Sequence, residues 1–250
     1  MRALPIAVLG IAAYAVLLAL TVPARYLAAR LEDSAPGRYQ VREAEGTLWH
    51  GSAKAVLRAP GGALVVERVQ WDFLASRLAS GRLAFAIDVK GAGFEARYEL
   101  ARSLSGWGVR DLAARADAAI ATLALPWLAH WRPEGTVSAT APAIDVAGND
   151  LRGTLAVEWK GAAVAHSQVK PLGSWRAEVR AEGGAAKVRV ATLDGPLNIT
   201  GQGTLTLPAR LAFTGEARAE GADARALEPL MNLLGPAKPD GTRTLDWRVP

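Results

Sequence analysis

The sequence predicts a mainly β protein: one long, curved antiparallel sheet with two short helices, held by a single N-terminal transmembrane helix. Three observations predict this arrangement. From Tyr39 onward, apolar and polar residues alternate in runs that are bounded by glycine, as in half-buried strands. Residues 3–22 form an apolar stretch without a charged side chain. Two parts of the remaining chain also resemble each other, which favours one repetitive sheet over unrelated domains.

The apolar stretch from Ala3 to Val22 contains 20 residues. As a helix it would be about 30 Å long, enough to cross the hydrocarbon core of a bilayer. We therefore expect a short cytoplasmic stub at residues 1–2, an anchor at 3–22 and a juxtamembrane linker at 23–38. A cleaved secretory signal is the alternative, because Val22-Pro23-Ala24 resembles a cleavage site. The stretch is longer than a typical signal core of about 7–15 residues, which favours retention.

The charges that flank the apolar stretch do not fix its orientation. Arg2 precedes it, whereas Arg25 and Arg30 follow it, so the positive-inside rule gives no clear answer. We expect the large domain on the non-cytoplasmic side, because a signal-like first segment directs the following chain across the membrane. The chain has no cysteine, which agrees with an oxidising compartment.

Residues 39–250 read as a series of strands joined by short glycine turns, and such neighbours pair as an antiparallel meander. The partner of the final strand is left open by the sequence. Two segments, Asp117 to His130 and Asp223 to Leu234, instead place apolar residues near helical spacing. Because Pro126 and Pro229 lie inside them, we expect each helix to be short, kinked or begun at its proline.

The two helical segments occupy matching places in an internal repeat. Each follows an Ala-Arg-Ala-acid sequence, and each is followed by an apolar cluster, a proline loop and Gly-Thr, at Gly135-Thr136 and Gly241-Thr242. We therefore predict a first repeat at about 46–134, a second at about 135–240, and the opening of a third at 241–250. Chance similarity in a sequence rich in alanine and glycine is the alternative.

The residue types argue against catalysis. There is no cysteine, and His50, His130 and His166 are scattered without a second ligand at metal-binding spacing. We expect no catalytic residue, no metal ion and no cofactor. Acidic and basic residues alternate and form no basic runs, so we expect no nucleic-acid partner.

The tryptophans are the candidate contact residues. Trp49, Trp71 and Trp159 are expected in strands, where the plain interpretation is core packing. The alternative is an apolar groove that accepts a partner segment or a lipid chain. Trp127 and Trp131 lie in the first helical segment and are candidates for contact with the membrane interface, where tryptophan is favoured.

A series of short motifs resembles a known family. The motifs include Glu45 to Gly51 (EGTLWHG), Leu78 to Leu83 (LASGRL), Pro126-Trp127-Leu128, and Leu193 to Leu197 (LDGPL). In this order, after one anchor, they resemble type II secretion system protein N over nearly the whole chain. The Gly-x-Leu-Trp-x-Gly element also resembles the start of AsmA-like envelope proteins, which hold long β-grooves.

The resemblance implies a single-pass inner-membrane subunit whose main domain faces the periplasm. Its role would be structural or in assembly, within the machinery that exports folded proteins across the outer membrane. Its expected partners are other type II secretion subunits, and membrane lipid through the anchor. The family offers no catalytic residues to carry over. The AsmA-like resemblance implies the alternative, a lipid-binding or lipid-transfer protein of the bacterial envelope.

Overall fold

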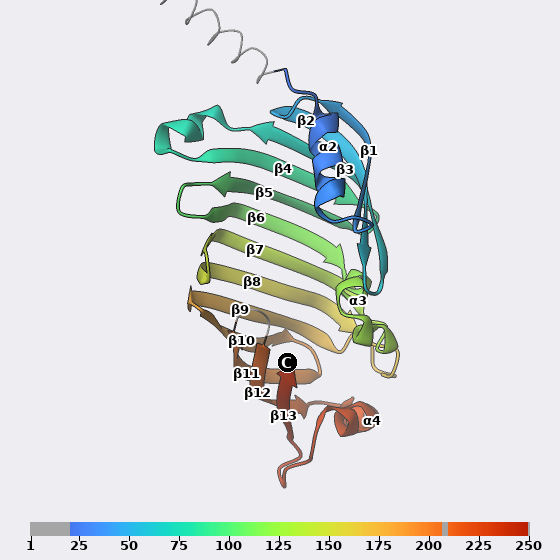
Figure 1. Cartoon of the computed structure of the whole chain (residues 1–250). Helices are drawn as coiled ribbons and strands as arrows, with labels where there is room; N and C mark the ends of the chain where they lie inside the picture. The colour runs from blue at the N-terminus through green and yellow to red at the C-terminus, as the bar shows by residue number, and fades with distance from the viewer. Residues whose placement is uncertain (1–20, 207–209, 250) are drawn as a thin grey trace, which may run out of the picture.

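A computed structural model describes residues 21–206 and 210–249, which contain one antiparallel sheet of 13 strands (Figure 1). The order of strands in the sheet is their order along the chain, so each strand pairs with its sequence neighbours. The predicted meander is therefore confirmed. The strands are β1 (Tyr39–Gly46), β2 (His50–Ala59), β3 (Gly62–Phe73), β4 (Leu83–Gly91), β5 (Phe94–Arg102), β6 (Trp107–Asp117), β7 (Glu134–Ala147), β8 (Asp150–Ala163), β9 (Gly173–Gly183), β10 (Ala185–Asp194), β11 (Leu197–Thr206), β12 (Arg210–Ala219) and β13 (Arg243–Val249).

Short glycine turns produce this topology. Between β4 and β5, Gly91 pairs with Phe94, so only two residues form the loop. The second of them, Gly93, has a φ of 78°, a left-handed conformation that glycine adopts without steric cost. Connections of this length leave an antiparallel neighbour as the available partner of each new strand.

The helices are short. They are α2 (Ala24–Ser34), the 3-10 helix η1 (Ala75–Ser80), η2 (Ala118–Ile120), α3 (Ala121–Ala124), η3 (Pro126–His130) and α4 (Ala224–Leu234). The first predicted helical segment is thus divided into three pieces. The break comes at Leu125, whose ψ of 82° is not helical, because a residue before proline is biased away from the α conformation. The second predicted segment is one helix, α4, which continues through Pro229.

Helix α2 lies within residues 23–38, where the sequence led us to expect a linker. It packs against β1, and the Glu32 carboxylate accepts a hydrogen bond of 2.7 Å from the Val41 backbone N–H. The predicted anchor at 3–22 falls almost wholly outside the described residues. Among the helices of the described residues, none has the length and apolar character needed to cross a membrane.

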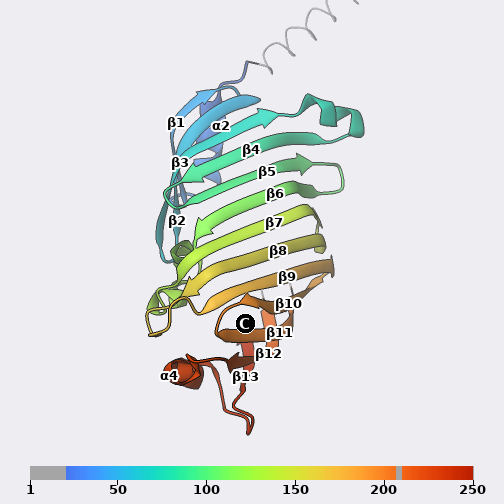
Figure 2. The ribbon, with the colours of Figure 1, turned by 180° about the vertical axis from the view of Figure 1, so that it is seen from behind.

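The sheet is strongly twisted. Figure 1 shows β4 to β9 stacked as successive rungs, whereas β10 to β13 turn away from them at the C-terminal end, and Figure 2 shows the same change from behind. Seven of the twelve strand pairs contain a register shift. Such bulges bend a strand and increase its local twist, so they add to the twist that strands have by themselves.

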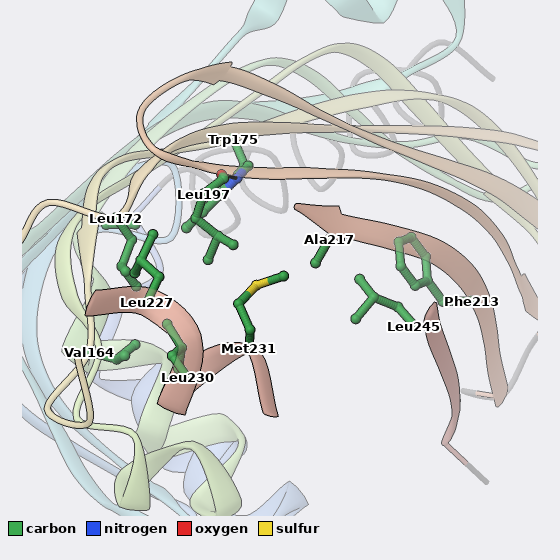
Figure 3. Close-up of a cluster of buried hydrophobic side chains, with 11 residues drawn as sticks. Val164, Leu172, Trp175, Leu197, Phe213, Ala217, Leu227, Leu230, Met231 and Leu245 are labelled. Atoms are coloured by element: carbon green, nitrogen blue, oxygen red, sulfur yellow. Dashed lines mark hydrogen bonds between the residues drawn. The ribbon is translucent and has the colours of Figure 1, made fainter. Parts of the chain in front are cut away.

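The main buried cluster lies at the C-terminal end of the sheet. Helix α4 contributes Leu227, Leu230 and Met231, which face apolar side chains of the strands (Figure 3). The strand and loop members include Val164, Leu172, Trp175, Leu197, Phe213, Ala217 and Leu245. Leu227 and Leu245 are fully buried, so this cluster fixes α4 and the last strands in place.

The structure also gives the partner of the final strand, because β13 pairs with β12. The two helical segments follow β6 and β12, and are therefore six strands apart. The domain boundaries and the repeat boundaries proposed from the sequence remain predictions.

Candidate functional site

The sheet has two chemically different faces. Leu155, Val179 and Val188 are opposite one another on β8, β9 and β10, and their side chains define what we call the apolar face. One residue along each strand, Thr154, Arg180 and Lys187 are likewise opposite one another and define the polar face. Successive side chains of a strand point to opposite faces, so the two surfaces follow directly from the alternating sequence.

The apolar face continues across most of the strands. Its side chains are half-buried, and α4 packs on the sheet at β12 and β13. Burial raises the pKa of the Tyr98 phenol above its ordinary value. Members of the face are Phe85, Ile87, Val89, Tyr98, Leu100, Val109, Val137, Ile144, Leu155, Val157, Val179, Val188 and Val190.

Trp49 and Trp71 both lie at the N-terminal end of this face. The Trp49 ring lies 4.8 Å from the Phe73 ring, edge to face, and 6.4 Å from the Phe85 ring. Trp71 donates its indole N–H to the Thr47 and Leu48 carbonyl oxygens, each at 3.2 Å. The two tryptophans therefore brace the connection between β1 and β2.

The expectation that Trp49 lies in a strand is wrong, because it lies between β1 and β2. The Thr47 hydroxyl accepts hydrogen bonds from the Trp49 and His50 backbone N–H groups, at 3.2 Å each. This local turn replaces strand pairing at Trp49. His50, just beyond it, faces Asp72 across the β2–β3 pair, and the two side chains are 3.1 Å apart.

Trp159 belongs to a second cluster. Its ring lies 5.5 Å from that of Trp175, edge to face, and it packs against the C-terminal core. Its indole N–H donates to the Glu134 carbonyl oxygen at 3.0 Å. The structure thus brings Trp49 and Trp71 together and places Trp159, five strands further along the sheet on β8, in different surroundings.

Trp127 and Trp131 also have different surroundings. The Trp127 side chain on η3 is 61% exposed. Trp131 packs partly against the C-terminal core, and its ring lies 5.7 Å from that of His166. His166 in turn donates from Nε2 to the His130 carbonyl oxygen at 3.1 Å, which closes the end of η3 onto the segment after β8. Trp127 is the more accessible of the two candidates for contact with a membrane surface.

The polar face is hollowed between β7 and β13, around a volume of about 1120 Å³. Arg180 and Lys187 are directly opposite each other there, and neither forms an ion pair with a described residue. Glu178 and Arg189 form the next opposed pair. Sequence reasoning did not single out this hollow. Its signal was the charge at every second residue of β9 and β10.

Several ion pairs lie on the rest of the polar face, and two groups of them shift a pKa. Glu158 forms ion pairs with Lys160 at 3.0 Å and with Arg176 at 3.1 Å. The hydrogen bond from Lys160, together with both positive charges, lowers the pKa of the Glu158 carboxyl. Glu99, only 9% exposed, accepts two hydrogen bonds from the Arg77 guanidinium, which raise the pKa of Arg77. This second pair holds η1 to the sheet.

The described residues contain no group of three or more side chains suited to hold a metal ion. The arrangement offers surfaces for binding: an extended apolar face, the charged hollow and the edges of the sheet. Such a molecule can bind partners along strands or faces.

Comparison with known proteins gives one result for family membership. The family model described as type II secretion system (T2SS), protein N, matches residues 37–246. No curated protein gives a match. No solved structure gives a match either. The matched range begins just before β1 and ends within β13, so it includes every strand of the sheet at least in part.

Proposed function

Because the chain belongs to the type II secretion system protein N family, we propose that it is an inner-membrane accessory subunit of the type II secretion machinery. In this proposal residues 3–22 are an uncleaved single-pass anchor and the sheet lies in the periplasm. The sheet takes part in the export of folded proteins across the outer membrane, in a structural or assembly role and without catalysis. The observation that carries this proposal is the family match over residues 37–246.

The surfaces of the sheet support a role in binding. Type II secretion subunits are its proposed partners, and a sheet with two different faces and open strand edges presents several contact surfaces to them. The membrane lipid contacts only the anchor and, at the surface, the exposed Trp127 ring. No nucleic acid is a partner in this proposal, because positive charges on the sheet alternate with negative ones.

A secretion assay in the parent bacterium tests the role. Deletion of the gene is expected to leave exported proteins in the periplasm, and expression of the intact chain is expected to restore export. A fusion of alkaline phosphatase after the sheet is expected to be active, because that enzyme needs the oxidising periplasm for its disulfides. Normal export without the gene, or an inactive fusion that is made in full, would contradict the proposal.

The alternative function is lipid binding or lipid transfer in the envelope, and the extent of the apolar face favours it. In this version acyl chains lie against the valines of β8 to β10, such as Val157, Val179 and Val188. The side chains of Trp49, Trp71 and Trp159 would then contact the acyl chains at separate places along the apolar face. The lining of the hollow, in contrast, includes several charged and hydroxyl side chains, such as Arg180, Lys187 and Thr204, which do not suit an acyl chain.

Photocrosslinking in living cells separates the two functions. A photoreactive amino acid is placed at Val179 on the apolar face, and at Arg180, the adjacent residue on the polar face, as the matched control. Adducts with other secretion subunits support the accessory role. Adducts with lipid at Val179 and not at Arg180, without protein adducts, support lipid binding instead.

A further inference from the structure

The two edge strands of the sheet, β1 and β13, differ in how far other parts of the chain cover their backbone. At the β1 edge, helix α2 packs against the strand, and the Glu32 carboxylate accepts a hydrogen bond from the Val41 backbone N–H. Next to it, Leu48 donates from its backbone N–H to the Val22 carbonyl oxygen at 2.8 Å. Natural sheets cover an edge in this way to prevent pairing with another chain.

Among the residues that the structure describes, only those at positions 236–237 cover the β13 edge, and they cover its beginning. Thr244 donates its backbone N–H to the Pro236 carbonyl oxygen at 3.3 Å, and Ala237 forms a bridge with Arg243. Because N–H and C=O groups of an antiparallel strand alternate between its two sides, those of Asp246 and Arg248 also point outward. Within residues 21–206 and 210–249, none of these outward backbone groups of Asp246 and Arg248 has a partner.

We propose that the free part of β13, residues 245–249, pairs antiparallel with the same strand of a second copy of this chain. The two-fold axis passes through Trp247, so that each Asp246 is opposite Arg248 of the second copy. The two sheets then form one continuous sheet of two copies, joined at their C-terminal edges. An isologous contact of this kind is closed and stops at two copies.

Charge complementarity selects this partner and this register. Asp246 and Arg248 form an ion pair with each other within one chain, at 3.5 Å. With Trp247 on the axis, each of them also lies opposite a residue of opposite charge on the second copy, so that the four charges alternate, which favours the pairing. A shift of the axis by one residue toward the N-terminus places Asp246 opposite Asp246 of the second copy. A shift the other way places Arg248 opposite Arg248 of the second copy. Both shifts bring like charges together, and longer shifts toward the N-terminus meet the covering segment at residues 235–237.

The hydrogen-bond pattern agrees with the same register. Asp246 and Arg248 both present outward N–H and C=O groups, as a hydrogen-bonded antiparallel pair requires. Trp247 then occupies a non-hydrogen-bonded pair, in which the opposite side chains are closest. Its ring is 45% exposed and lies 5.7 Å from the Phe213 ring, so the contact would place two Phe-Trp stacks side by side on the apolar face.

Cysteine crosslinking of the full chain in its own membrane tests the pairing. The chain has no cysteine of its own, so any disulfide must involve the introduced residue. In a non-hydrogen-bonded pair the Cα atoms are about 4.5 Å apart, a separation that a disulfide can span. Trp247→Cys is therefore expected to form a covalent dimer at least about tenfold faster than Leu78→Cys, because pairing raises the effective concentration of the thiols. Leu78 is a suitable control because it is 53% exposed on η1.

A second pair of variants keeps the tryptophan. Differently tagged chains with Asp246→Cys and Arg248→Cys are expected to crosslink to each other, and each is expected to crosslink poorly with itself. Equal rates for Trp247→Cys and Leu78→Cys, or covalent capture of a different protein in place of a second copy, would overturn the proposal.

Exchange of the two charges tests the register. In the Trp247→Cys background, Asp246→Arg alone and Arg248→Asp alone are each expected to lower the rate of dimer formation, since like charges then meet. The double variant restores the opposite charges and is expected to regain the original rate. Failure of the double variant to exceed both single variants would refute this register.

Discussion

The docking of α4 on the sheet gives the sharpest stability prediction. Leu227 is fully buried among Met231, Leu197 and Leu172 in the C-terminal cluster. Its replacement by alanine removes buried methyl groups and leaves a cavity that the surrounding strands fill only in part. Such changes cost about 2–5 kcal/mol, and we expect about 3 kcal/mol because the site is closed on all sides by sheet and loop.

Urea unfolding of the detergent-solubilised chain, followed by tryptophan fluorescence, measures this loss. With a denaturant slope of about 2 kcal/mol/M, a loss of about 3 kcal/mol lowers the midpoint by about 1.5 M. Leu233→Ala on the same helix is the matched control, since Leu233 is 62% exposed and its loss should change stability by less than about 0.5 kcal/mol. If Leu227→Ala costs no more than Leu233→Ala, α4 does not form the core described above.

Three further predictions concern single carboxylates. The hydrogen bond from Lys160 lowers the pKa of the Glu158 carboxyl. The ionised carboxylate therefore stabilises the fold above the ordinary carboxyl pKa, and this stabilisation is lost as the pH falls through the lowered pKa. Glu158→Gln removes this group, so it should flatten the decline of the urea midpoint below about pH 5. An unchanged acid profile would show that this carboxylate is not stabilised by its neighbours. Glu99→Gln leaves the half-exposed Arg77 without its ion pair and should cost about 1–2 kcal/mol by the same unfolding assay, with little further loss when Arg77→Ala is added. Full additivity of the two changes would exclude the pairing. Glu32→Ala removes the acceptor for a β1 amide and should speed hydrogen exchange across residues 39–42, measured by mass spectrometry, while β8 amides serve as the unaffected reference.

The strands and α4 could be predicted because their patterns are local. Alternation with a period of two, glycine turns and a proline-terminated apolar cluster each specify a short piece of chain without reference to distant residues. Helix α2 was missed because Arg25, Arg30, Glu32 and Asp33 give its segment the composition of an exposed linker. The helix depends on contact with β1, and that contact is not a property of its own sequence.

The two faces illustrate a different limit. Within a strand the alternation identifies which side chains share a face, but each bulge changes the count by one. Asp111, for example, has a φ of 50° at the register shift between β5 and β6, and Arg110 and Leu112 on either side of it point to opposite faces. The alignment of Arg180 with Lys187 depends on the position of the turn between β9 and β10, and the separation of Trp71 from Trp159 depends on the order of the strands in the sheet. Both relations follow from how the strands pair, which the alternation within a single strand does not specify.

The strand order has a consequence for how the molecule is made. Each strand from β2 to β13 pairs with the strand immediately before it in the chain, so none of them depends on a segment that is synthesised later. Contacts between neighbours in sequence close small loops, which lowers the entropy lost at each step. A chain delivered N-terminus first can thus add rungs to an existing sheet in the order of their arrival, beginning beside α2. Among the 13 strands described, β13 is then the last to be added.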